Sequence, residues 1–151
     1  MNRKFLDNDY MTLIVRLVVG GIFIYASLDK ITTPAQFARI VYNYHLLPSS
    51  LINIFALVLP WVELICGIFL IVGFKQRGSI LILNLLVLTF IVALTINLFR
   101  GVDIECGCFT VSSKAKSSII ELLLRDIGLL ALTLYLIVSR SRRFVISASD
   151  R

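Results

Sequence analysis

Residues 78–99 read GSILILNLLVLTFIVALTINLF, and no ionisable side chain occurs between Arg77 and Arg100. A helix needs about 20 mostly apolar residues to cross the hydrocarbon core of a bilayer. This run has that length and contains no proline, so it predicts a transmembrane helix.

Three further apolar runs lie outside this segment, at about 12–31, 51–74 and 119–138. The chain has 151 residues, of which 58% are hydrophobic, and its mean hydropathy is +0.93. Soluble domains contain about 45–50% apolar residues, and a soluble protein this small has too little interior to bury more. We therefore predict an all-α fold: one membrane domain over residues 1–151, built as a bundle of four transmembrane helices. A cleaved signal peptide is a weaker reading of the first run, because Arg16 and Lys30 interrupt it and no small-residue cleavage site follows.

A short helix is predicted between the first two spans. Its apolar positions have one-sided helical spacing, and Pro34 suits the first turn of a helix; these positions are Phe37, Ile40, Val41, Tyr44 and Leu47. We expect this helix to lie at the membrane interface. Ser50 is the expected cap of the second span.

The net charge of +6 sets the orientation of the spans. Basic residues are normally more frequent on the cytoplasmic side. One side of the predicted bundle would hold Arg3, Lys4, Lys75, Arg77, Arg140, Arg142, Arg143 and Arg151, and the other would hold Lys30, Arg39, Arg100, Lys114 and Lys116. Both termini are thus expected in the cytoplasm, with residues 139–151 as a basic cytoplasmic tail. The basic residues form no face interleaved with exposed aromatics, so no nucleic-acid partner is expected.

Cys106 and Cys108 flank Gly107 between the third and fourth spans, on the side expected to face outward. A disulfide across so few residues is strained, and strained, exposed disulfides are labile and suited to exchange. A structural bridge, half of a metal site and inert thiols are the alternatives. Zinc usually needs four ligands, and only His45 is near in topology, so no metal is expected. Cys66, inside the second span, is expected to be a small buried hydrophobe.

Ionisable side chains also occur within the predicted spans. Such residues are costly in a bilayer and usually face the bundle interior with partners; here they are Arg16, Lys30, Glu63, Arg125 and Asp126. Glu63 is expected to pair with Lys30 or Arg125, and Arg16 to extend towards the headgroups. On the fourth span, Glu121, Arg125 and Gly128 share the face expected to point inward. The set is either an ion-pair network or a polar pocket for a quinone head group, for protons or for a partner's helix.

The sequence resembles the MauE branch of the DoxX superfamily of small bacterial membrane proteins. Five segments carry the resemblance: ASLDKI (26–31), PAQFARIVYNYHLLP (34–48), LPWVEL (59–64), NLFRGVDIECGCF (97–109) and LLLRDIGLL (122–130). It implies a protein of the bacterial inner membrane that is linked to extracytoplasmic thiol redox chemistry during methylamine dehydrogenase maturation, beside a thioredoxin-like partner. The resemblance makes Cys106 and Cys108 the redox pair, with Lys30, Glu63 and Arg125 as polar support.

Two functions therefore remain open. The first is a thiol–disulfide oxidoreductase that exchanges electrons between the thioredoxin-like partner and the membrane, where a quinone is a candidate cofactor. The second is a non-catalytic assembly factor or scaffold, in which the cysteines form a static bridge. A small-solute carrier is disfavoured, because no inverted repeat is visible.

Overall fold

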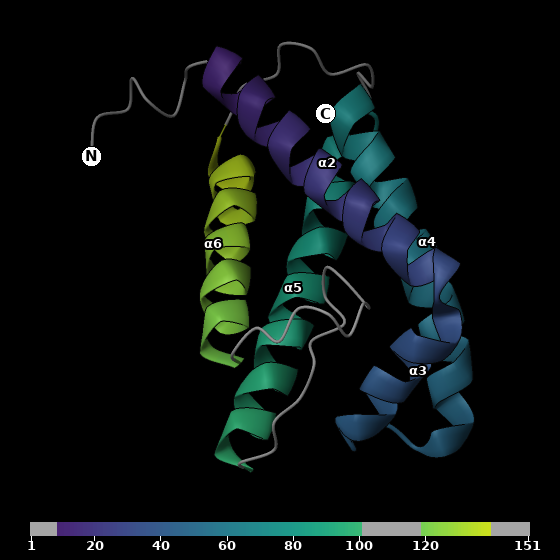
Figure 1. Cartoon of the computed structure of the whole chain (residues 1–151). Coiled ribbons are helices and arrows are strands. Elements are labelled where there is room, and N and C mark those ends of the chain that lie inside the picture. The colour runs from purple at the N-terminus through teal and green to yellow at the C-terminus, as the bar shows by residue number, and fades with distance from the viewer. Residues whose placement is uncertain (1–8, 101–118, 140–151) are drawn as a thin grey trace.

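The computed structural model describes residues 9–100 and 119–139, and these residues form five α-helices and no strand (Figure 1). The helices are α2 (Asp9–Thr32), α3 (Pro34–Asn43), α4 (Ser49–Val72), α5 (Gln76–Phe99) and α6 (Ile119–Val138). The all-helical prediction is thus confirmed. The cysteine pair at 106 and 108 and the basic tail beyond residue 139 lie outside the described residues.

Three of the described helices, α2, α4 and α5, are long and apolar enough to cross a membrane. The fourth expected span corresponds to α6. This helix carries Glu121, Arg125 and Asp126 in its first half, and it is not among the three.

The long helices pack side by side in a fixed order. α2 packs extensively along α4, α5 lies between α4 and α6, and α6 also contacts α2. The short helix α3 packs on α4 close to the end of α2, at the same end of the molecule as the end of α5 and the start of α6 (Figure 1). The segment 101–118 is therefore attached at the end that α3 occupies.

Close packing of α2 on α4 depends on two glycines. A Cβ atom on Gly67 would lie 3.1 Å from the backbone oxygen of Gly20, and a Cβ atom on Gly20 would lie 3.0 Å from the backbone oxygen of Gly67. The two backbones thus approach each other where neither residue has a side chain, which is how small residues act between membrane helices.

The bundle differs from a soluble protein in its apolar outer surface and in the charged side chains that it buries. Its buried residues include Arg16, Lys30, Glu63 and Asp126. Large apolar side chains are exposed along the outside, among them Ile14, Leu57, Trp61, Ile65, Leu81, Leu85 and Leu134. Water would disfavour such an apolar surface, whereas lipid does not. Together with the three apolar helices, this surface identifies an integral membrane protein.

The helix boundaries follow local backbone chemistry. α4 ends at Val72 because Gly73 has a left-handed backbone with φ 82°, and the amide of Gly73 donates to the carbonyl of Phe69. The expected cap at Ser50 is wrong. The helix begins at Ser49, with Pro48, two residues before Ser50, in the N-cap position and no side-chain cap bond. The ring of Pro48 restricts its φ angle, and its extended backbone sets the direction in which the chain enters the helix.

Candidate functional site

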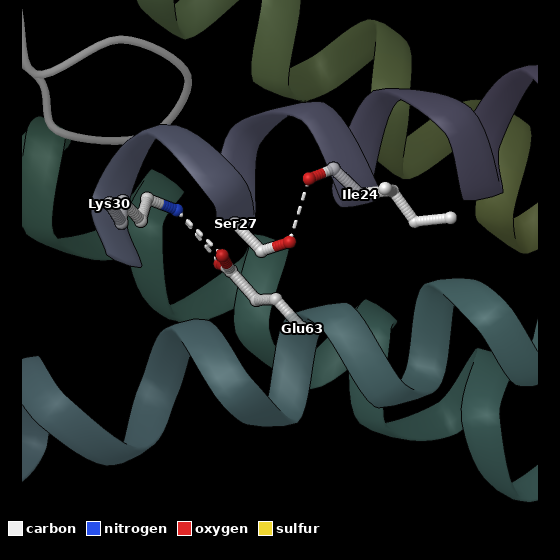
Figure 2. Close-up of polar contacts among 4 residues, drawn as sticks. All are labelled: Ile24, Ser27, Lys30 and Glu63. Atoms are coloured by element: carbon white, nitrogen blue, oxygen red, sulfur yellow. Dashed lines mark hydrogen bonds and ion pairs between the residues drawn. The ribbon is translucent and has the colours of Figure 1, made fainter. Parts of the chain in front are cut away.

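A buried ion pair joins α2 to α4. The Lys30 ammonium donates to both carboxylate oxygens of Glu63, with distances from Nζ of 2.7 Å to Oε2 and 3.0 Å to Oε1. Both side chains are shielded almost completely, with 0% and 1% of their surfaces exposed. Figure 2 shows Glu63 reaching from α4 to Lys30, with Ser27 one turn earlier on α2. Of the two partners that the sequence allowed for Glu63, Lys30 is the one that forms this pair.

The spacing of buried residues explains why the pair meets. On α4 the buried face runs through Ile52, Ala56, Leu59, Glu63, Cys66 and Leu70, at alternating steps of three and four residues. Glu63 takes one position of this otherwise apolar face and Lys30 takes the last buried position of α2. The charges are therefore inside because the helical period places them there, and they must pair to remain there.

Two aromatic rings enclose the Lys30 ammonium. Its nitrogen lies 5.4 Å from the centre of the Phe37 ring on α3 and 5.2 Å from that of Phe90 on α5. The negative faces of aromatic rings attract cations, particularly where water is excluded. Helices α2, α3, α4 and α5 thus all contribute to the surroundings of one lysine. The sequence placed Phe37 on the apolar side of the predicted interfacial helix but did not identify either ring as a neighbour of Lys30.

Asp126 of α6 is the second buried acid. Only 4% of its surface is exposed, and its Oδ2 has no hydrogen-bond partner among the described residues. The carboxylate is within electrostatic range of Lys30. Lys30, Glu63 and Asp126 form what we call the buried charge cluster.

The inward face of α6 differs from the one expected. Glu121, Arg125 and Gly128 are exposed, whereas Asp126, Leu129, Thr133 and Leu136 are buried. Consecutive residues point about 100° apart on a helix, so Asp126 can face α5 and α2 only if Arg125 turns outward. The rest of α6 is mostly apolar on every side, so its sequence did not reveal which face would pack.

Arg16 has a different environment from the other charges. Its Nε donates to the carbonyl of Leu70 at 3.1 Å, and its Nη2 donates to the carbonyl of Ile71 at 3.3 Å. These carbonyls lie in the last turn of α4, where no backbone amide of the helix is available to them. The side chain is 2% exposed, so it caps α4 inside the protein and does not extend outward as expected.

The end of the bundle that carries α3 is tied to the end of α5. Arg100, the residue after α5, donates from Nη1 to the carbonyl of Tyr44 at 3.4 Å. Tyr44 is the C-cap of α3. The predicted redox pair, Cys106 and Cys108, falls in the segment that starts directly after Arg100 and lies outside the described residues.

The residues that the structure describes contain no group of three or more His, Cys, Asp or Glu side chains that could hold a metal ion. Cys66 is a buried free thiol within an apolar cluster that includes Phe23, Leu70 and Leu83. Its prediction as a small buried hydrophobe is confirmed.

Comparison with known families gives one match over most of the chain. Residues 8–139 match the family described as methylamine utilisation protein MauE. The matched range includes the buried charge cluster, Arg16 and the two cysteines at 106 and 108.

Curated relatives agree with this match. The chain is 32% identical over 127 residues to methylamine utilization protein MauE of Methylophilus methylotrophus, covering 83% of this chain and 65% of the relative. It is 35% identical over 121 residues to the protein of that name from Paracoccus denitrificans, covering 80% and 64%. For Methylorubrum extorquens the identity is 33% over 109 residues, covering 72% and 59%. The chain thus matches slightly less than two thirds of the length of these relatives. No solved structure matches the chain.

Proposed function

Because the chain belongs to the MauE family of methylamine utilisation proteins, we propose that it is a membrane thiol–disulfide redox protein of methylamine utilisation. Cys106 and Cys108 are the exchanging pair. The names of the relatives mention methylamine utilisation and describe those proteins. Both the pathway and the redox role are therefore proposals for this chain. The observation that carries it is the position of the cysteines: they lie within the family match, between helices α5 and α6.

The proposed topology has four spans, with α6 as the fourth and α3 at the outer interface. Both termini are in the cytoplasm, and the cysteine pair faces outward from the bacterial inner membrane. The buried Asp126 supports this role for α6, because a helix that carries charges must turn them towards other helices to remain in lipid. An outward cysteine pair would meet the oxidising conditions in which disulfides persist.

The proposed chemistry is a dithiol–disulfide exchange with a thioredoxin-like extracytoplasmic protein. A thiolate of the Cys106–Cys108 pair attacks one sulfur of the partner's disulfide, so a mixed disulfide forms and a partner thiolate leaves and takes up a proton. The second cysteine of the pair then attacks the mixed disulfide. The pair becomes oxidised and the partner becomes a dithiol. Every step is reversible, so the same atoms also serve electron flow in the opposite direction.

A membrane quinone is the proposed second couple. It would accept two electrons and two protons from the Cys106–Cys108 dithiol, giving the disulfide and a quinol, or the quinol would return them. The buried charge cluster gives this couple little direct support, because the Lys30 ammonium is already engaged by both oxygens of Glu63.

Trapping of the mixed disulfide tests the exchange. Removal of the cysteine that resolves a mixed disulfide should make that intermediate accumulate, so either Cys106→Ser or Cys108→Ser should capture a thioredoxin-like protein when cells are quenched with acid. The double variant should capture none. Cys66→Ser is the matched control, since that thiol is buried, and it should behave as the wild type does.

A scaffold function is the competing outcome. It predicts that neither single variant forms a mixed disulfide and that the Cys106→Ser/Cys108→Ser protein fully supports growth on methylamine in a strain that lacks the native protein. That pair of results would exclude the redox proposal.

A further inference from the structure

The buried charge cluster contains one positive and two negative groups. Lys30 forms an ion pair with Glu63, which leaves Asp126 as the second acid, with 4% of its surface exposed. Two cations lower the cost of a charge on Asp126: first the guanidinium of Arg125, its exposed neighbour on α6, and then the Lys30 ammonium of α2. α5, the other helix packed against α6, has one charged residue within its bounds, Arg77 in its first turn. With every group ionised, the three buried side chains of the cluster have a net charge of −1; Arg125 is exposed and is not counted among them.

The surroundings of Asp126 favour its neutral form. Its Oδ2 accepts no hydrogen bond from any described residue. An ionised carboxylate with an unpaired oxygen in a low-dielectric interior is less stable than the neutral acid, which carries no net charge to be solvated. A single proton on Asp126 brings the cluster to zero net charge.

Glu63 is a poorer site for that proton. Both of its oxygens accept from the Lys30 ammonium. The Phe37 and Phe90 rings further stabilise the positive form of Lys30. A proton on Glu63 would remove the strongest attraction available to that buried cation. The pair therefore stays ionised while Asp126 changes its protonation state.

We propose that Asp126 is a proton-binding residue inside the bundle and that it forms, with the Lys30–Glu63 pair, a membrane-embedded site for one proton. Asp126 is seven residues from the start of α6, or about 10 Å along the helix axis. The site therefore lies about two turns from the end to which the cysteine-bearing segment is attached. Loading and release of the proton change the net charge of the cluster between zero and −1. This inference goes beyond thiol exchange and does not depend on it.

Infrared spectroscopy of the full-length protein in lipid nanodiscs tests the site, with ¹³C-carboxyl aspartate as the label. The wild type should show a protonated aspartic acid band at mildly acidic pH that disappears as the pH rises. Asp126→Asn should lack this band at the same mildly acidic pH. Glu121→Gln, which changes an exposed acid five residues earlier on α6, should retain it.

Two results would overturn the proposal. One is the absence of a protonated aspartic acid band from the wild type at mildly acidic pH, and the other is an identical band in Asp126→Asn at that pH. The first result needs no variant, so the test holds even if Asp126→Asn folds poorly. Mixed-disulfide trapping on the same preparations reports on the cysteines separately, so failure of either proposal can be recognised without the other.

Discussion

Lys30 and Glu63 are two buried charged residues, and each is stable in the interior only because the other is paired with it. Each is among the most completely buried side chains of the described structure. Either charge alone would be strongly disfavoured in lipid. Together they form two hydrogen bonds at 2.7 and 3.0 Å, between two aromatic rings. Breaking such a pair from one side leaves an uncompensated charge, whereas removing both charges does not.

Substitution of the pair should therefore give strongly non-additive stability changes. Lys30→Met should lower the free energy of unfolding by roughly 3–5 kcal/mol, because Glu63 is left buried without its cation. The Lys30→Met/Glu63→Gln double variant should recover a large part of that loss. The measurement is a double-mutant cycle of unfolding in mixed detergent micelles. Lys75→Met, which alters an exposed lysine, is the control and should change stability little. Additive single and double effects would show that the two charges are not coupled.

Arg16 shows a second way to keep a charge inside. It donates to two carbonyls of the last turn of α4. The negative end of the helix dipole lies there, so the cation is stabilised by the end of a helix. Arginine suits this position because its planar guanidinium group can donate hydrogen bonds to two acceptors at once.

At the scale of elements, the α2–α4 pair organises the molecule. Gly20 and Gly67 allow the two backbones to meet, Arg16 joins the start of α2 to the end of α4, and Lys30 and Glu63 join them further along. Three different interactions thus hold one helix pair in a single register. A shift along either helix would separate the charges as well as the glycines.

Alanine substitutions at the glycines test this register. Gly67→Ala should destabilise the protein by about 1–3 kcal/mol, the usual cost of overpacking, because its Cβ would meet the backbone of Gly20 at 3.1 Å. Gly21→Ala is the matched control: nothing lies within 4 Å of its Cβ position. The control should be neutral or slightly stabilising, since alanine favours helices. Thermal unfolding in one detergent compares the two. Equal effects would show that the close contact is not needed.

At the scale of the whole molecule, the position of α6 decides the topology. The helix packs on α5 and α2, and its outer surface carries Leu124, Ile127, Leu134 and Ile137. That surface suits lipid. Three charged residues in its first turns, Glu121, Arg125 and Asp126, are the reason that α6 is not among the helices whose composition alone marks them as candidate spans.

Reporter fusions test whether α6 crosses the membrane. With four spans, a reporter after residue 151 and one before residue 1 should both be cytoplasmic. A membrane-impermeant maleimide added to intact spheroplasts should then modify a cysteine at position 106 or 108 in a Cys66→Ser background. If α6 does not cross, the two terminal reporters lie on opposite sides. That result would overturn the four-span topology and would place the C-terminal tail outside.

The sequence alone determined which segments are helices and that the protein is embedded in a membrane. Both properties depend on the composition of each segment and on the spacing of its apolar residues. Neighbouring helices cannot alter either one. Gly73, for instance, ends α4 through its own backbone freedom.

Only the tertiary structure decided which charges meet. Pairing of Glu63 with Lys30, the capping of α4 by Arg16 and the burial of Asp126 in place of Arg125 all depend on the rotation of each helix about its axis. In an apolar helix that rotation is set by packing against neighbours, because lipid accepts every apolar face equally well. The charges near the ends of α2 and α6 therefore acquire their roles only once the helices are assembled.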